Sequence, residues 1–168
     1  MAKQRERKLI QDYILARYPG RRVIFGCPLG PVPERLIATW GPQKALRVGR
    51  GLRPEVDALV FEDSTLILVE AKIVKWMDGV SKLPVYKGLV PTTPELQQYR
   101  DWPVYMVLCI PWLTESIMAS ARSVGVSVDE FTTPDLELYV QELHKYWTSE
   151  YRIAREEKRR ARELLGLE

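Results

Sequence analysis

The stretch that decides the fold is EVDALVFEDSTLILVEAK, residues 55–72. VDALVF and TLILVEA are rich in aliphatic and β-branched side chains, and a short polar segment separates them. This pattern predicts two buried strands joined by a tight turn. The charged side chains of Asp57, Glu70 and Lys72 interrupt these strands. Charged residues are rarely placed in buried strands without a partner or a function.

The register of this hairpin decides whether the charged side chains meet. With Asp63-Ser64 as a two-residue turn, Asp57 lies opposite Glu70 and Glu55 lies opposite Lys72. Directly paired residues have Cβ atoms about 5 Å apart, and residues two apart on a strand share a face. Neighbouring carboxylates repel each other and lose solvation, so they favour a compensating cation. Mg²⁺ prefers carboxylate oxygens, a metal-bound water is a hydrolytic nucleophile at neutral pH, and an ammonium can steer it.

The remaining segments predict an α/β fold in which helices flank a mixed central sheet. Residues 31–54 are interpreted as a loop or hairpin arm with strands at ERLIATW and KALRVGR, and residues 73–92 as a loop. Helices are expected at 4–18, from about Thr93, at 114–125 and, with a break near Trp147–Glu150, from Pro134 onward. Further strands are expected at 21–30, 104–111 and 126–132. The resulting order is α-β-β-β-α-β-α-β-α. We expect a domain at 1–132 and a C-terminal helical extension at 133–168.

Composition excludes several kinds of site. His144 is the sole histidine, so neither a Cys/His zinc site nor a His-dependent catalytic triad can be assembled. Cys27 and Cys109 lie in apolar runs that are typical of reduced core thiols. The apolar run 104–113 is too short to span a bilayer, and MAKQRERK lacks the apolar region of a signal peptide. We expect no membrane partner and a cytoplasmic location, or the host cytoplasm or virion for a viral protein.

Basic residues are concentrated in one part of the chain, although the formal net charge is only +3. The segment from Arg35 to Arg53 contains no acid and five basic residues: Arg35, Lys44, Arg47, Arg50 and Arg53. Together with the neighbouring Trp40, this distribution favours DNA binding through backbone phosphates, without readout of base sequence. The alternative is an ordinary solvated loop.

The hairpin carries a family resemblance. Asp57, followed after 12 residues by Glu70-Ala71-Lys72 on an apolar strand, resembles the PD-(D/E)xK nuclease superfamily. The expected α-β-β-β-α-β order is similar to the restriction-endonuclease-like core of that superfamily. The N-terminal part most resembles archaeal-type Holliday junction resolvases, which carry a metal-binding glutamate on the first helix where Glu6 stands. The resemblance implies that Glu6, Asp57 and Glu70 bind Mg²⁺ or Mn²⁺ and that Lys72 is the catalytic lysine.

A second, RecB-like feature lies downstream. ELQQYRD, residues 95–101, is similar to the Gln-x-x-x-Tyr helix of RecB-like exonucleases, although Glu95 stands in place of the glutamine. Gln97 and Tyr99 are therefore accessory site candidates, together with Glu55. The alternative for Gln97 and Tyr99 is a solvated helix face with a core tyrosine.

The hypothesis from the sequence is a metal-dependent DNA endonuclease or junction resolvase that hydrolyses phosphodiester bonds. The alternative is a non-catalytic nuclease-fold structural or assembly protein associated with DNA, such as a phage head or packaging component. The residues also have alternative interpretations of their own: Asp57 is a strand-edge acid near the turn-rich segment 49–54, and Glu70 and Lys72 are a solvated strand end with Lys72 paired to Glu55. Glu6 would then favour the helix dipole of the first turn. A homodimer or larger assembly would use the C-terminal helix.

Overall fold

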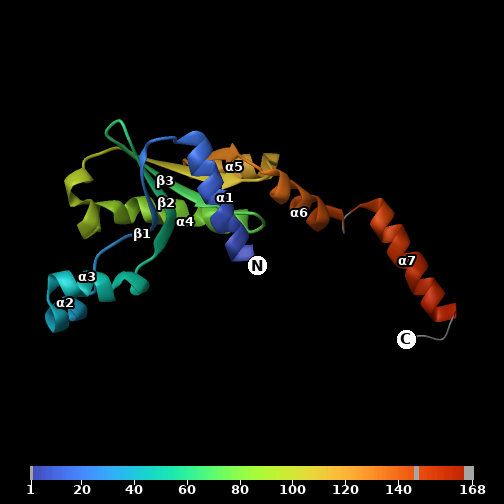
Figure 1. Cartoon of the computed structure of the whole chain (residues 1–168), viewed down its shortest axis with the longest axis horizontal. Helices are drawn as coiled ribbons and strands as arrows, with labels where there is room; N and C mark the ends of the chain where they lie inside the picture. Colours follow the sequence, from blue (N-terminus) through green and yellow to red (C-terminus); the bar gives the residue numbers. More distant parts are fainter. Residues whose placement is uncertain (1, 146–147, 165–168) are drawn as a thin grey trace. The chain divides into compact units, whose positions relative to one another are not determined.

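The computed structural model describes residues 2–145 and 148–164, which divide into two compact units, Met1–Thr132 and Thr133–Glu168. The first unit contains one five-stranded sheet in the order β1-β2-β3-β4-β5 (Figure 1). The strands are β1 (Arg22–Pro28), β2 (Glu55–Glu62), β3 (Thr65–Ala71), β4 (Val104–Ile110) and β5 (Ser127–Glu130). The first three are antiparallel neighbours, whereas β3, β4 and β5 run parallel. The mixed sheet predicted from the sequence is confirmed.

The β2–β3 hairpin has the predicted register. Val60 pairs with Ile67, and Glu62 pairs with Thr65. Asp63 and Ser64 have φ values of 43° and 62°. Two consecutive positive φ values are required by the type I′ turn, whose twist matches that of the flanking strands. The turn is therefore two residues long, and the same register brings Asp57 beside Glu70 at the end of the hairpin away from the turn.

Helices cover both faces of the sheet. Helix α1 (Ala2–Arg17) contacts β2 and β3 and buries Leu9, Ile10, Tyr13 and Ile14. Helices α4 (Trp76–Leu89) and α5 (Glu115–Ser123) belong to the main apolar cluster. That cluster includes Leu59 and Leu68 but not the residues directly before and after each of them in the strand. It therefore covers the face of the sheet opposite to α1. Asp57 is two residues from Leu59 and Glu70 is two residues from Leu68, so each carboxylate shares a face with that leucine. Asp57 and Glu70 therefore lie on the face of the sheet that α4 covers.

The crossover helix between β3 and β4 lies earlier than predicted. Residues 73–92 were predicted to form a loop, but Trp76–Leu89 form α4. From Thr93 onward the predicted helix is only a 3₁₀ helix, Pro94–Tyr99, preceded by another at Val90–Thr92. Burial of Val80, Leu83 and Tyr86 at helical spacing outweighs the helix-breaking tendency of Pro84.

The two strands predicted between β1 and β2 are wrong. ERLIATW forms helix α2 (Glu34–Trp40), and KALRVGR falls mainly in helix α3 (Pro42–Val48), followed by the 3₁₀ helix Arg50–Leu52. Gly41 has φ 72°, which favours glycine, and separates the two helices. Pro42 is the first residue of α3, a position that suits its fixed φ. We call residues 31–54, which connect β1 to β2, the helical arm.

The remaining elements largely follow the prediction. The Thr114 side chain accepts a hydrogen bond of 3.3 Å from Ile117 N at the start of α5, as expected of an N-cap, and β5 is an edge strand. Cys27 and Cys109 are free, buried thiols. The second unit contains α6 (Pro134–Lys145) and α7 (Ser149–Leu164); the position between them, 146–147, lies outside the described residues.

Within residues 2–145 and 148–164, no helix is both long enough and apolar enough to cross a bilayer.

Candidate active site

Four charged side chains from α1, β2 and the end of β3 meet at one end of the hairpin. Lys72 Nζ lies 3.1 Å from Glu70 Oε2, 3.7 Å from Asp57 Oδ2 and 4.0 Å from Glu6 Oε2. We call Glu6, Asp57, Glu70 and Lys72 the carboxylate–lysine cluster. The structure thus brings together all four residues that the sequence nominated for metal binding and catalysis. Lys72 does not pair with Glu55, which bonds to Arg50 instead.

Backbone amides hold each carboxylate of the cluster. Ala71 N donates to Asp57 Oδ2 at 2.9 Å, and Asp57 N donates to Glu70 Oε1 at 3.3 Å. Ile73 N donates to Glu6 Oε1, also at 3.3 Å. A backbone N–H donated to an ionised carboxylate is a charge-assisted hydrogen bond, stronger than a neutral one. The carboxylates are therefore positioned by the hairpin and by the chain directly after β3, not by long flexible side chains alone.

The cluster is buried at its base and open at its rim. The side chains of Glu70 and Lys72 are only 2% and 11% exposed, whereas those of Glu6 and Asp57 are 25% and 36% exposed. The alternative of a solvated strand end is therefore wrong for Glu70 and Lys72. With all four groups ionised, three carboxylates and one ammonium carry a net charge of −2. Burying an incompletely balanced charge is unfavourable, so the cluster attracts cations.

The electrostatics of the cluster follow from this burial. Burial, followed by the charge of Asp57, raises the pKa of Glu70 from 4.5 to about 7, against the opposing effect of Lys72. Burial alone would lower the pKa of Lys72, but the charges of Glu70, Asp57 and Glu6 outweigh it and raise that pKa. Lys72 is therefore a permanent cation at neutral pH, whereas Glu70 titrates near neutrality.

Helix α4 closes the buried side of the cluster through two residues that the sequence did not nominate. A Cβ on Gly79 would lie 2.5 Å from Leu108 Cδ1 and 3.2 Å from Lys72 Cγ. The overlap with Leu108 explains why glycine is needed where α4 packs on β4, beside the stem of Lys72. Tyr86, on the same helix, has its pKa raised to about 12 by burial and then by the charges of Glu70 and Asp57. Both residues could have been found from the helical spacing of the apolar residues in α4, but Pro84 made that segment resemble a loop.

The donor chemistry of the cluster suits a hard divalent cation. Carboxylate oxygens are the protein ligands that Mg²⁺ and Mn²⁺ prefer, and Mg²⁺ commonly takes only one or two of them and retains waters. In the described part of the chain, no group of three or more His, Cys, Asp and Glu side chains is arranged to hold an ion. A pair such as Asp57 and Glu70 fits these requirements; coordination by Glu6 as well would need side chains to move.

The structure corrects the predicted role of Arg53. Its side chain is 2% exposed, and its guanidinium forms a bidentate ion pair with Glu95, in which Nη1 lies 2.9 Å from Oε2. Nη1 also donates to Gly30 O at 3.1 Å. The hydrogen bonds that Arg53 donates to Glu95 lower the pKa of that carboxyl group. A buried, paired guanidinium is not available to a DNA phosphate, so Arg53 fastens the helical arm to the segment before β4 instead.

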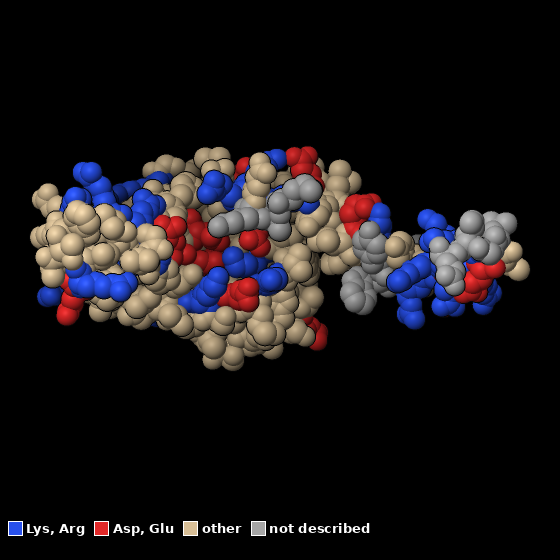
Figure 2. All heavy atoms as spheres, turned by 90° about the horizontal axis from the view of Figure 1, so that it is seen from below, with Lys and Arg blue, Asp and Glu red and all other residues tan. Residues whose placement is uncertain are grey.

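The other predicted DNA-binding residues are exposed. Arg35, Lys44 and Arg47 project from the helical arm, and Arg50 donates to Glu55 Oε1 at 3.1 Å and to Gly26 O at 2.9 Å. On the face shown in Figure 2, Lys and Arg side chains gather where Figure 1 places α2 and α3, beside a group of acidic side chains. Through its bond with Arg50, Glu55 is linked to the helical arm and not to Lys72.

Gln97 and Tyr99 do not join the cluster. Gln97 Nε2 donates to the carbonyls of Pro91 and Thr93, so it stabilises its own segment. Tyr99 accepts a 2.6 Å hydrogen bond from Arg22 and packs edge-on against Phe61. Because Phe61 lies near the turn end of β2, Tyr99 stands at the opposite end of the hairpin from Asp57. The alternative interpretation of both residues as structural agrees with these contacts.

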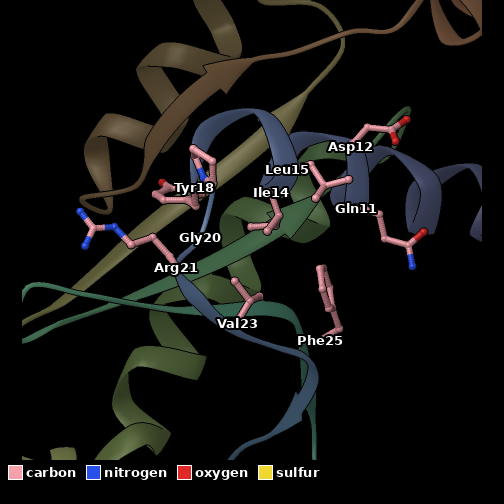
Figure 3. A pocket seen from close by; sticks show the side chains of 10 residues that line it. Gln11, Asp12, Ile14, Leu15, Tyr18, Gly20, Arg21, Val23 and Phe25 are labelled. Atoms are coloured by element: carbon pink, nitrogen blue, oxygen red, sulfur yellow. The ribbon is translucent and has the colours of Figure 1, made fainter.

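A groove of about 510 Å³ lies between α1 and β1 (Figure 3). Exposed apolar side chains such as Leu15 and Phe25 line it, and no member of the carboxylate–lysine cluster does. The groove and the cluster are therefore separate features of the first unit.

Comparisons with known proteins give only remote similarity. No protein-family model matches the sequence, and no curated protein sequence is significantly similar to it. The structure resembles that of a repair endonuclease from Pyrococcus abyssi, with 15% sequence identity, a TM-score of 0.44, and coverage of 76% of this chain and 47% of that chain. It also resembles an EndoMS–dsDNA2 complex, with 17% identity, a TM-score of 0.44, and coverage of 76% and 44%. The chain spans less than half the length of either protein. A likeness this remote carries no argument about function.

Proposed function

We propose that the protein is a metal-dependent deoxyribonuclease of the PD-(D/E)xK type, an endonuclease or junction resolvase that hydrolyses phosphodiester bonds. The observation that carries this proposal is the carboxylate–lysine cluster itself. The ammonium of the buried Lys72 lies 3.1 Å from the carboxylate of the buried Glu70 and 3.7 Å from that of the partly exposed Asp57. Burying these charges lowers the stability of the fold, and charged groups that are kept at such a cost are concentrated at functional sites.

In this proposal, Asp57 and Glu70 hold one Mg²⁺ or Mn²⁺, and Glu6 assists from α1. The net charge of −2 on the four ionised side chains matches one divalent cation. When bound, the metal would act as a Lewis acid and lower the pKa of a bound water. The cation also favours the ionised form of Glu70, whose pKa is otherwise raised to about 7 by burial and Asp57.

Lys72 would orient the attacking water and offset the negative charge that develops on the phosphate. Its ammonium is kept protonated by the surrounding carboxylates, which raise its pKa, so it acts as a fixed positive charge and not as a general base. Its proximity to the three carboxylates limits the positions that its ammonium can occupy. A preorganised charge of this kind stabilises a transition state without reorganisation.

The test is cleavage of labelled branched, duplex and single-stranded DNA with Mg²⁺ or Mn²⁺, with EDTA as the metal-free control. We expect Lys72→Met to reduce the rate by about 100- to 1,000-fold, as for loss of one preorganised electrostatic contact, and Glu70→Gln to reduce it and to weaken Mn²⁺ binding in calorimetry. Lys75→Met is the matched control, because Lys75 is an exposed lysine just after the cluster.

Circular dichroism would establish that each variant is folded. If the folded wild-type protein cleaves none of these DNA forms with either metal, the nuclease proposal is wrong. The non-catalytic structural or assembly protein would then be the better hypothesis. Cleavage that Lys72→Met leaves unchanged would instead remove the cluster as the active site.

A further inference from the structure

The helical arm presents an exposed tryptophan. Trp40, the last residue of α2, is 46% exposed, and Ile37 one turn earlier on the same face is 39% exposed. The ammonium of Lys44, from α3, lies 3.8 Å from the centroid of the Trp40 ring. This is a cation–π contact, which keeps the ring at the surface beside a positive charge. Trp40 therefore contributes little to the core, and its ring is accessible to a binding partner.

The charge around Trp40 indicates the chemistry of that partner. Two of the five basic residues of the arm are neutralised: Arg53 by Glu95, and Arg50 by Glu55. Three exposed cations remain, Arg35, Lys44 and Arg47, and among the described residues none of them forms an ion pair with an acid. The segment 35–54 contains no acidic side chain at all. An aromatic ring among unbalanced cations is complementary to a polyanion that carries flat rings.

The arm is attached close to the carboxylate–lysine cluster. Arg50 bonds to Glu55 and to the carbonyl of Gly26. Glu55 is two residues before Asp57 on the same strand face, a separation of about 7 Å. The β1–β2 register places Gly26 opposite Asp57, where its φ of 59° is one that glycine favours. The base of the arm, where Arg50 bonds to Glu55, therefore lies next to the cluster.

We propose that the helical arm binds an unpaired DNA strand by stacking a base on Trp40, with Lys44 and Arg47 holding the adjacent phosphates. The substrate would then be DNA with a single-stranded segment, such as a flap or overhang, and not a continuous duplex. Within a duplex each base is covered by its neighbours, so a protein that binds only duplex backbone has no use for an exposed tryptophan. This inference rests on the proposed nuclease function for its substrate but is tested by binding alone.

The experiment is fluorescence anisotropy of the full chain with a labelled flap oligonucleotide and with a blunt duplex of equal length, in EDTA so that no turnover occurs. We expect Trp40→Ala to weaken binding to the flap roughly 5- to 100-fold, the usual effect of losing one base-stacking side chain, and to change duplex binding by less than about twofold. Trp40→Phe keeps a ring and should retain most of the affinity. Leu52→Ala, at an exposed apolar position of the same arm, should change neither.

Equal weakening of flap and duplex binding by Trp40→Ala, or no weakening of either, would overturn the inference. So would analytical ultracentrifugation in which Trp40→Ala converts a dimer to a monomer, because Trp40 would then lie in a contact between two copies. Failure of the proposed function gives a different result: the wild type would bind the flap selectively without cutting it in Mg²⁺ or Mn²⁺.

Discussion

Replacing Glu70 by Gln should stabilise the fold while reducing the proposed DNA cleavage, and the gain in stability should depend on pH. The folded state raises the pKa of Glu70 from 4.5 to about 7, mainly by burial. Between these two values the folded chain binds more protons than the unfolded chain, so stability falls as pH rises through this window. Gln cannot ionise and keeps nearly the same shape, so Glu70→Gln removes that loss.

The magnitude follows from the two pKa values. At about 1.4 kcal/mol for each pKa unit, full ionisation of Glu70 lowers the free energy of unfolding by about 3 kcal/mol at pH 8 and by less than about 1 kcal/mol at pH 5. Urea unfolding of the wild type and of Glu70→Gln, each in EDTA at pH 5 and pH 8, measures the difference. Added Mg²⁺ should reduce the gain, because a bound cation stabilises the ionised form.

Glu62→Gln provides the control for this measurement. Glu62 is at the turn end of β2 and forms a partly exposed ion pair with Arg21 at 3.1 Å, so its replacement should change stability by less than about 1 kcal/mol, without growth between pH 5 and pH 8. The reasoning would be refuted by a Glu70→Gln variant no more stable than the wild type at pH 8, or by a gain that is larger at pH 5.

Three further predictions concern the packing of α4, the buried ion pair of Arg53 and a phosphate contact of Arg47. Gly79→Ala should lower the free energy of unfolding by about 1–3 kcal/mol in urea, because the new Cβ overlaps Leu108, whereas Gly88→Ala on the same helix has no atom within 4 Å to meet and should be neutral or stabilising. Arg53→Lys should cost on the order of 2 kcal/mol of stability through its buried ion pair yet leave DNA affinity of the folded protein unchanged in anisotropy. Arg47→Ala should keep stability but reduce the slope of log affinity against log salt by about 0.7–0.9; an unchanged slope would exclude a phosphate contact.

The hairpin could be predicted from the sequence because its information is local. The turn at Asp63-Ser64 sets the register, and the register alone brings Asp57 beside Glu70. The contribution of Glu6 depends on how α1 packs across the sheet, which no local pattern specifies; a family resemblance suggested it, and the structure places it beside Lys72.

The errors arise where distant packing decides the outcome. Helix α4 was missed because Pro84 and two glycines indicate a loop locally, whereas buried contacts with β3 and β4 stabilise the helix. Arg53 was assigned to DNA because a run of charge does not reveal which member is buried. Its partner Glu95 lies 42 residues away in the chain, and only the folded structure brings the two together.

The position of the helical arm in the topology has a consequence for how this scaffold can change. The arm lies between β1 and β2, which are adjacent antiparallel strands, and such strands can be joined by as few as two residues. The sheet therefore does not depend on the arm for its connectivity. Insertions, deletions or exchanges in this segment can be accepted over generations without rebuilding the buried cluster, so chains with the same carboxylate–lysine cluster can come to present different surfaces between β1 and β2.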